Sequence, residues 1–358
     1  MRTRYGIMSG VKRMQTKTCA IAIVFAVAVC GVAAGREPYQ PGIGSPGVHY
    51  ATDAYPGFDS ESELLGPEKK EPRLFGWIYG PEKEDAAAQL AWCRECVSNE
   101  SWRAARLGFD ALVREWPTSP EAPVAQKELA DLYADHYRES ENAFREYNYL
   151  LDFYSSQCDY AAIAARAYAM AEAMRKEGKR VFFVPFANTV DVRRAYEAVV
   201  LRAPGAPFTP RAMLTVGSLR EDEGRDDLAV SVYENLRNLH PTTPEAIRSL
   251  HCEARALMKL LRDYGYNRER CKATVDFLRF TLANHRDFEG RDEVEGWLAE
   301  AQETLEGEAF AAARFYDSPT RTRQSAIDAY EAFIRNYPAS VHAEKARARL
   351  AELKGEPK

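Results

Sequence analysis

A recurring apolar stripe constrains this chain more than any other feature of its sequence. A small residue is followed four positions later by an aromatic residue, three further on by a large apolar residue, and four further on by a ring side chain and proline. These steps put the side chains on one face of a helix, and the proline ends that helix. Three copies have this spacing: Ala105, Phe109, Leu112, Trp116 and Pro117; Ala229, Tyr233, Leu236, His240 and Pro241; and Ala326, Tyr330, Phe333, Tyr337 and Pro338. We assign these residues to a repeat core that holds neighbouring helices together.

Weaker copies of the stripe fill the space between the clear ones. They start at Ala143 and Val192, and a further amphipathic helix is predicted over Arg268–His285. Stripe starts from Ala105 to Ala229 are 38, 49 and 37 residues apart, longer than the period of about 34 residues in tetratricopeptide repeats. The units would therefore have lengthened helices or loops. We therefore predict an all-α fold, a tetratricopeptide-like α-solenoid of about five helix-pair repeats over residues 84–353, with a sixth, less regular pair. An ordinary helical bundle with coincidental stripes is the alternative.

The segments after two of the stripes read as helix starts. Ser119 and Thr243 are each followed by proline, then by glutamate. Serine and threonine side chains accept backbone N–H bonds at a helix N-cap, and proline is tolerated at the first helical position. We predict Ser119 and Thr243 as N-caps.

The N-terminal region has the pattern of an export signal. Residues 1–35 carry five basic side chains and no acid, and an uncharged run covers Thr18–Gly35. A basic region before an apolar core is typical of a secretory signal peptide, and the run is short for a membrane span. We predict a signal peptide over residues 1–34, with an uncleaved anchor as the alternative.

Cys30 ends the apolar core and is followed by Gly31, as in a bacterial lipoprotein signal. Acylation there would make Cys30 a lipid anchor, and the signal would then end before it. Val29 departs from that pattern, which wants Gly, Ala or Ser before the cysteine. The alternative is cleavage near Ala34 without a lipid.

The composition limits the class of partner that the protein can bind and indicates how the rest of the chain is organised. Removing residues 1–35 takes the net charge from −5 to −10, and an acidic exported product is a poor candidate for binding nucleic acid. Residues 36–83 hold seven prolines and seven glycines and offer no continuous apolar face, so we expect a flexible tether over 35–83. Leu74–Tyr79 is apolar enough to dock on the first repeat. Residues 354–358 form a short tail.

Several residues could carry chemistry, but each has a simpler interpretation. Cys93 and Cys96 form a C-x-x-C, yet they sit in a predicted helix without the preceding strand of a redox motif, so we expect them to pack in the core. His251 and Cys252 are adjacent and point about 100° apart on a helix, which disfavours a shared metal. We predict no catalytic residue, no metal site and no cofactor, hence no enzyme.

The acids around Gly224, the predicted turn between two helices, are Glu221, Asp222, Glu223, Asp226 and Asp227. We expect them to be solvated, as turn and helix-start acids usually are.

The chain resembles the BamD family of outer-membrane assembly lipoproteins, the ComL/YfiO type, over roughly residues 85–352. The residues that carry the resemblance are an N-terminal Cys30, Trp116-Pro117-Thr118-Ser119 in the first repeat, and, in the last, Phe310–Tyr316, Ala326–Tyr330, Asn336–Ser340, Ala343, Ala346 and Leu350. The long tether, Val29 and an apolar insertion near 178–188 depart from the family pattern. That insertion could be a packed loop or an exposed docking strip, and we favour packing.

The resemblance implies a non-catalytic role in assembling and inserting β-barrel proteins into the outer membrane. The implied partners are a β-barrel insertase and unfolded barrel chains, with no nucleic acid, and with the membrane reached only through the N-terminal anchor. The implied location is the periplasmic face of the outer membrane. The alternative is a soluble periplasmic adaptor of the CpoB/YbgF type in envelope division or cell-wall synthesis. Trp92, Tyr133 and Tyr137 are candidate groove-side aromatics, although core packing is favoured for each.

Overall fold

The structure, a computed structural model, describes residues 55–59, 69–70, 80–178, 189–263, 267–318 and 320–355. All described residues belong to one compact unit, His49–Lys358. The predicted signal peptide with Cys30, the apolar stretch Leu74–Tyr79 and residues 179–188 of the insertion lie outside the described residues.

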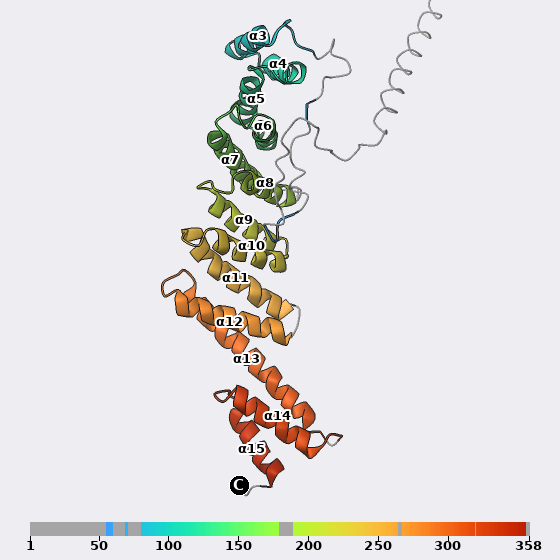
Figure 1. Ribbon diagram of the computed structural model, residues 1–358, viewed down its shortest axis with the longest axis vertical. Coiled ribbons are helices and arrows are strands. Elements are labelled where there is room, and N and C mark those ends of the chain that lie inside the picture. The colour runs from blue at the N-terminus through green and yellow to red at the C-terminus, as the bar shows by residue number, and fades with distance from the viewer. Residues whose placement is uncertain are drawn as a thin grey trace, which may run out of the picture. The chain divides into compact units, whose positions relative to one another are not determined.

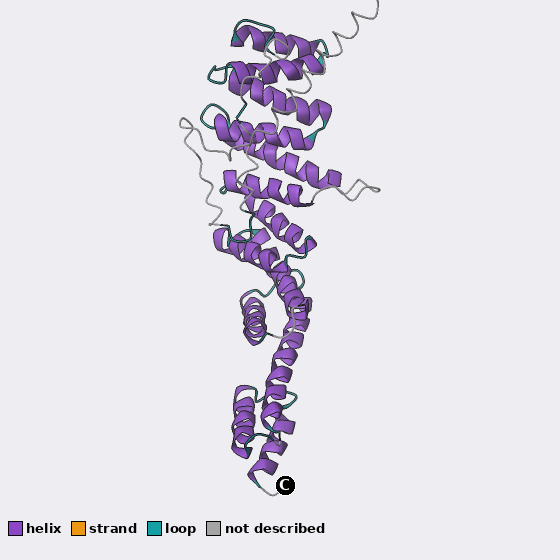
Figure 2. Ribbon diagram, turned by 90° about the vertical axis from the view of Figure 1, so that its right-hand side faces the viewer, coloured by secondary structure: helices purple, strands orange, loops and turns teal. Residues whose placement is uncertain are grey.

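The described residues form helices and loops, without a strand (Figure 2). The helices are α3 (Ala86–Ser98), α4 (Trp102–Glu115), α5 (Ala122–Asp131), η3 (Leu132–Tyr137, a π-helical turn), α6 (Ser140–Phe153), α7 (Tyr160–Gly178), α8 (Thr189–Arg202), α9 (Thr209–Asp222), α10 (Asp226–Leu239), α11 (Pro244–Asp263), α12 (Arg268–Asn284), α13 (Arg291–Tyr316), α14 (Arg323–Asn336) and α15 (Ala343–Lys354).

Helices that follow one another in the chain pack side by side (Figure 1). Short loops between them make neighbours antiparallel, so α3–α14 form six helix pairs, with α15 added after the last. Each stripe lies on the second helix of a pair: α4, α6, α8, α10 and α14. The predicted all-α, tetratricopeptide-like fold is therefore confirmed.

The apolar positions of the stripes lie in the interior. In α4, α10 and α14 the small, aromatic and large apolar residues are each at most 3% exposed: Ala105, Phe109, Leu112, Ala229, Tyr233, Leu236, Ala326, Tyr330 and Phe333. The closing residues differ, because the chain turns there. Trp116, Pro117, His240 and Tyr337 are half-buried, while Pro241 and Pro338 are exposed.

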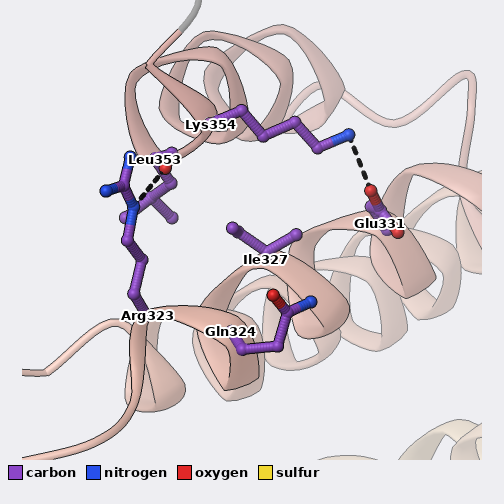
Figure 3. A pocket seen from close by; sticks show the side chains of 6 residues that line it. All are labelled: Arg323, Gln324, Ile327, Glu331, Leu353 and Lys354. Atoms are coloured by element: carbon purple, nitrogen blue, oxygen red, sulfur yellow. Dashed lines mark hydrogen bonds and ion pairs between the residues drawn. The ribbon is translucent and has the colours of Figure 1, made fainter.

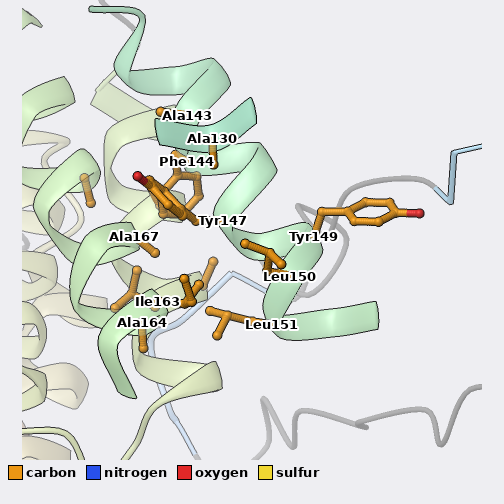
Figure 4. Packing of buried hydrophobic residues seen from close by; sticks show 14 of the residues in the cluster. Ala130, Ala143, Phe144, Tyr147, Tyr149, Leu150, Leu151, Ile163, Ala164 and Ala167 are labelled. Carbon is orange, nitrogen blue, oxygen red and sulfur yellow. The ribbon is translucent and has the colours of Figure 1, made fainter. Parts of the chain in front are cut away.

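The buried residues fall into three clusters along the chain. The first extends from Leu90 in α3 to Leu236 in α10, the second joins α11, α12 and the first part of α13, and the third joins the end of α13 to α14 and α15. Figure 4 shows a part of the first cluster, where Phe144 and Leu150 of α6 meet Ile163 and Ala167 of α7. The long helix α13 thus belongs to two clusters.

One predicted N-cap is confirmed and the other is wrong. Helix α11 starts at Pro244, and the Thr243 hydroxyl oxygen accepts the Ala246 N–H at 3.4 Å. Helix α5 starts only at Ala122, after a turn in which the N–H of Ala122 bonds to the Ser119 carbonyl, and the Ser119 hydroxyl has no partner within the structure. The loop after α4 uses backbone bonds where the sequence suggests a side-chain cap.

Candidate polypeptide-binding site

Part of the expected tether lies on the helices. Residues Tyr55–Asp59 and Lys69–Lys70, which we call the docked segment, contact α4, α5, α6, α8, α9 and α10. At these seven residues, and at Glu82 and Lys83, whose N–H groups donate to Gln89 of α3, the structure differs from a flexible tether. The tether remains a prediction for the residues of 35–83 outside the described ranges.

Lys70 fills an acidic site between α4, α5 and α6. Its ammonium lies 3.2 Å from Asp110, 2.8 Å from Glu146 and 3.1 Å from the Gln126 side-chain oxygen. The ammonium also lies 5.3 Å from the centroid of the Tyr149 ring, a cation–π contact. The Lys70 side chain is 8% exposed. Buried lysines are rare unless they are paired, and here two carboxylates and an amide supply the partners.

Tyr149 belongs to this site as well as to the first buried cluster. Figure 4 shows its ring pointing away from Tyr147 and Leu150, yet it is only 2% exposed. Its hydroxyl accepts the backbone N–H of Lys70 at 3.3 Å. The site therefore binds the backbone as well as the side chain of Lys70.

The acidic site is arranged to keep the Asp110 carboxylate ionised. Burial alone would raise the pKa of Asp110, but the charges of Lys70 and Arg114 outweigh it and hold that pKa below its ordinary value. Arg114 donates to Asp110 at 2.8 Å. A negative site beside a buried ammonium is electrostatically complementary, and removing Asp110 and Glu146 would leave the Lys70 ammonium without an opposite charge.

A second site, of mixed charge, holds the other end of the docked segment. The Asp59 carboxylate lies 3.1 Å from Arg194 and 3.5 Å from Arg193, both on α8. The Asp59 N–H donates to Glu197 at 3.2 Å, and Arg220 of α9 donates to the Gly57 carbonyl at 3.0 Å. Here too the helices bind backbone groups and a side chain together.

Arg193 and Glu197 are the buried pair beneath Asp59. The Arg193 side chain is 3% exposed and the Glu197 side chain is fully buried, with 2.7 Å between them. Arg193 also donates to Glu223 at 2.8 Å, and Arg220 lies 3.4 Å from both Glu197 and Glu223. Such a network leaves few polar atoms unsatisfied under the docked segment.

Gly57 fits where no other residue would. Its φ is +89°, a left-handed conformation that favours glycine. A Cβ atom at this position would lie 2.6 Å from the Leu228 carbonyl oxygen and 2.8 Å from Val232 Cγ2, both on α10. The docked segment thus touches α10 with its backbone.

The docked segment crosses the array against the order of its helices. Tyr55–Asp59 contact α8–α10, Lys70 contacts α4–α6, and the backbone N–H groups of Glu82 and Lys83 donate to Gln89 of α3. We call the side chains under the docked segment the docking face: Asp110, Gln126, Glu146, Tyr149, Arg193, Arg194, Glu197 and Arg220.

The repeats place a polar residue at one recurrent position of this face. The residue after the stripe aromatic is Asp110 in α4, Asn148 in α6, Glu197 in α8, Glu234 in α10 and Glu331 in α14. Asp110 and Glu197 contact the docked segment, while Glu234 and Glu331 are exposed. The sequence analysis missed this position, although the recurrence of acid or amide after each aromatic could have revealed it.

The candidate cysteines are buried in α3. Cys93 is fully buried and Cys96 is 8% exposed, and both are free thiols. Burial raises the pKa of Cys93 to about 12 and also raises the pKa of Cys96. Thiol redox chemistry needs a thiolate of lowered pKa, so this environment opposes it.

His251 and Cys252 separate as expected of neighbours on a helix. The His251 ring stacks on Trp297 at 5.4 Å and lies 3.1 Å from Glu293, whereas Cys252 lies near Arg255. Within the described ranges no cluster of three or more His, Cys, Asp or Glu side chains could hold a metal ion.

The prediction of a solvated acidic turn is wrong for three of its five residues. The Glu223 side chain is only 14% exposed and pairs with Arg193 and Arg220. Asp222 and Asp227 are exposed, but Glu221 and Asp226 are buried. Glu221 accepts from Tyr233 at 2.7 Å, from Arg255 at 2.9 Å and from Lys259 at 3.2 Å. The cations, Arg255 and Lys259, belong to helix α11. The sequence of the turn itself therefore could not predict that Glu221 is buried and paired.

Trp92, Tyr133 and Tyr137 are half-buried and pack against the first cluster. Tyr133 also accepts from Arg106 at 3.1 Å. None of the three is among the residues of the docking face, so core packing describes them better than groove contacts.

A shallow hollow lies between α14 and α15 (Figure 3). Arg323, Gln324, Ile327, Glu331, Leu353 and Lys354 line it. Lys354 pairs with Glu331 at 2.7 Å, and Arg323 donates to the Leu353 carbonyl. Its charged side chains are thus already paired across the hollow.

No protein-family model matches the chain, and no curated protein matches it. Solved structures do match. A kinesin light chain-like protein of Podospora anserina with nearly identical TPR-like repeats is 16% identical, with a TM-score of 0.28, covering 57% of this chain and 100% of that one. The pilF protein of Pseudomonas aeruginosa is 14% identical, with a TM-score of 0.26, covering 74% of this chain and 97% of that one.

A tetratricopeptide repeat protein of Parabacteroides merdae is 11% identical, with a TM-score of 0.28, covering 75% of this chain and 98% of that one. Likenesses this low carry no argument about function. The helix pairs themselves indicate a repeat scaffold, a fold typical of protein–protein interaction and usually non-catalytic. None of the helices in the described part of the chain is both long and apolar enough to cross a membrane.

Proposed function

We propose that this protein is a non-catalytic scaffold at the periplasmic face of the outer membrane, resembling BamD, that assists the assembly and insertion of β-barrel proteins. The observation that carries the proposal is the docking face, which holds a stretch of polypeptide through its backbone and charged side chains. Its partners would be a β-barrel insertase and unfolded barrel chains.

The chemistry of the docking face suits a non-native client. The N–H groups of Asp59 and Lys70 and the carbonyl of Gly57 are bound by side chains of the helices. Backbone groups are present in every polypeptide, so these contacts do not depend on client sequence. The charged contacts of Lys70 and Asp59 would add a preference for clients with matching charges.

The N-terminal pattern supports the location. A basic region, an apolar core and Cys30 would direct export and acylation. Diacyl and amide-linked chains on Cys30 would anchor the protein firmly, since two or more chains suffice. Residues 35–83 would then connect the anchor to the repeats.

Fractionation and affinity capture test this proposal. The tagged chain, expressed in a diderm bacterium, should sediment with outer membranes and retain a β-barrel insertase after mild detergent extraction. A Cys30→Ala variant should be released from the membrane fraction, and a Cys19→Ala variant, altered earlier in the same apolar run, should not. Recovery of the unaltered chain as a soluble periplasmic protein with no insertase attached would contradict the proposal.

A soluble periplasmic adaptor of the CpoB/YbgF type is the second candidate, favoured by Val29 before the cysteine and by small residues up to Gly35. It predicts cleavage near Ala34 and no acyl group. The mass of the mature N-terminal peptide decides between the two, because a terminal acylated Cys30 excludes the soluble form.

A further inference from the structure

We propose that the docking face is the binding site for an extended segment of a partner protein that presents a lysine and, about eleven residues before it, a carboxylate, and that the docked segment occupies this site in cis. The inference rests on the proposed binding function and names the partner chemistry and its regulation. A partner must displace Tyr55–Asp59 and Lys69–Lys70 to bind.

The acidic site is specific for a lysine. An ammonium has three N–H donors, and three acceptor atoms of Asp110, Gln126 and Glu146 lie within 3.2 Å of the Lys70 nitrogen. A planar guanidinium directs its donors differently and would not match acceptors from three helices around one point. Tyr149 adds a ring face and a bond to the backbone at the same residue.

The residue that follows the stripe aromatic in α6 is a buried amide without a hydrogen-bond partner. Asn148 is fully buried, and neither its side-chain oxygen nor its nitrogen has a hydrogen-bond partner in the structure. It occupies the position in α6 that Asp110 has in α4 and Glu197 has in α8, and both of those contact the docked segment. An amide offers one acceptor and two donors, which match the C=O and N–H of a peptide backbone. The described residues of the docked segment bond to neither atom of this amide.

The docked segment competes with a partner for the docking face because it is covalently tethered to the helices. It continues into α3 through Glu82 and Lys83, whose N–H groups bond to Gln89. A ligand on a short linker reaches an effective concentration on the order of millimolar. A free peptide of the same chemistry should therefore bind the unaltered chain poorly and bind well once the cis contacts are weakened.

Two substitutions in the docked segment weaken its contacts with the helices without changing any residue of a helix. Gly57→Ala places a Cβ 2.6 Å from the Leu228 carbonyl oxygen, and Lys70→Ala removes the ammonium. The exposed neighbour Lys69 supplies the matched control, Lys69→Ala.

The experiment measures fluorescence anisotropy of a labelled synthetic peptide of residues 53–72 titrated with the full chain. The Gly57→Ala/Lys70→Ala chain should bind it at least about tenfold tighter than the unaltered chain, because the tethered competitor is weakened. The Lys69→Ala chain should bind like the unaltered one. Circular dichroism melting verifies that each variant is folded.

Changes in the peptide keep the test independent of folding. Against the double variant, a peptide with Lys70→Ala should bind at least about tenfold weaker, since it lacks the ammonium that pairs with both Asp110 and Glu146. Lys70→Arg should also weaken it, and Lys69→Ala should not. In the double-variant chain, Asp110→Asn should reduce affinity, while Glu234→Gln, at the equivalent but exposed position of α10, should leave it unchanged.

Equal peptide affinity of the unaltered and double-variant chains overturns the proposal, and so does equal binding of the Lys69→Ala and Lys70→Ala peptides. The proposed function fails separately. A chain that binds the peptide as described but retains no barrel insertase keeps this inference and loses the barrel-assembly role. A chain that captures an insertase but does not bind the peptide keeps the barrel-assembly role and loses this inference.

Discussion

Glu253 on α11 is the carboxyl group whose burial should make stability depend on pH. It is 4% exposed, and burial raises its pKa to about 6, although the nearby Arg237 opposes the shift. Because the folded pKa lies above the unfolded value, the folded state keeps a proton between about pH 4.5 and 6 that the unfolded state releases. The contribution of Glu253 to stability is therefore present below that window and is lost as pH rises through it.

Glu253→Gln should abolish this dependence. Relative to the unaltered protein, the variant should gain about 2 kcal/mol of unfolding free energy between pH 4.5 and pH 7. Urea titrations at a series of pH values measure it, and Asp222→Asn, at an exposed acid of α9, is the control. Parallel pH profiles for Glu253→Gln and the unaltered protein would show that Glu253 does not titrate as described.

The cysteines differ enough in burial to react at different rates. In the folded protein at pH 8, iodoacetamide should modify the half-buried Cys158 well before Cys93, which is fully buried and has a pKa of about 12. Alkylation requires the thiolate, so both accessibility and ionisation protect Cys93. Mass spectrometry of tryptic peptides measures the extent, and denatured protein should lose the difference. Modification of Cys93 at the rate of Cys158 would revive the redox hypothesis.

At the scale of helices, a glycine allows α9 and α10 to approach each other closely. Gly217 of α9 faces Tyr233 of α10, and a Cβ there would lie 2.6 Å from the ring Cζ. Gly217→Ala should therefore overpack this contact and lower the unfolding free energy by about 1–3 kcal/mol. Gly296→Ala in α13 is the matched control, since nothing lies within 4 Å of its Cβ position.

For Gly296→Ala we expect the opposite sign, a gain of about 0.5–1 kcal/mol, because alanine has the higher helix propensity. Thermal melts of both variants give the comparison. A Gly217→Ala protein as stable as the Gly296→Ala protein would mean that α9 and α10 are not in close contact.

Elements also show how far local sequence predicts structure. The stripes identified α4, α10 and α14 because helical periodicity is a property of neighbouring residues. The N-cap at Thr243 was predictable for the same reason, but Ser119 was not, since the loop after α4 satisfies its N–H groups with backbone carbonyls instead.

At the scale of the whole molecule, stability should vary along the repeats. The third cluster has only Ala313, Tyr330, Phe333 and Ala346 as buried members, far fewer than the first. Repeat proteins gain stability from nearest-neighbour contacts and open locally where these are few. Native-state hydrogen exchange should show amides of α14 and α15 opening at lower free energy than those of α6–α10. A single opening free energy for all helices would contradict this.

The sequence by itself determined the helices, their pairing and the residues of the stripe core. It did so because hydrophobic periodicity and prolines act over a few residues. The N-terminal export pattern also rests on sequence, and Cys30 remains a prediction.

Only the tertiary structure decided which charged residues are buried. Lys70 and Tyr149 are 79 positions apart, and Asp59 and Glu197 are 138 apart. In sequence Lys70, Asp59 and Glu197 read as ordinary surface residues, because charged side chains are usually solvated. Burial follows when a distant segment or helix supplies the opposite charge, as Lys70 does for Asp110 and Arg255 does for Glu221. The docking face exists for that reason, and no local pattern contains it.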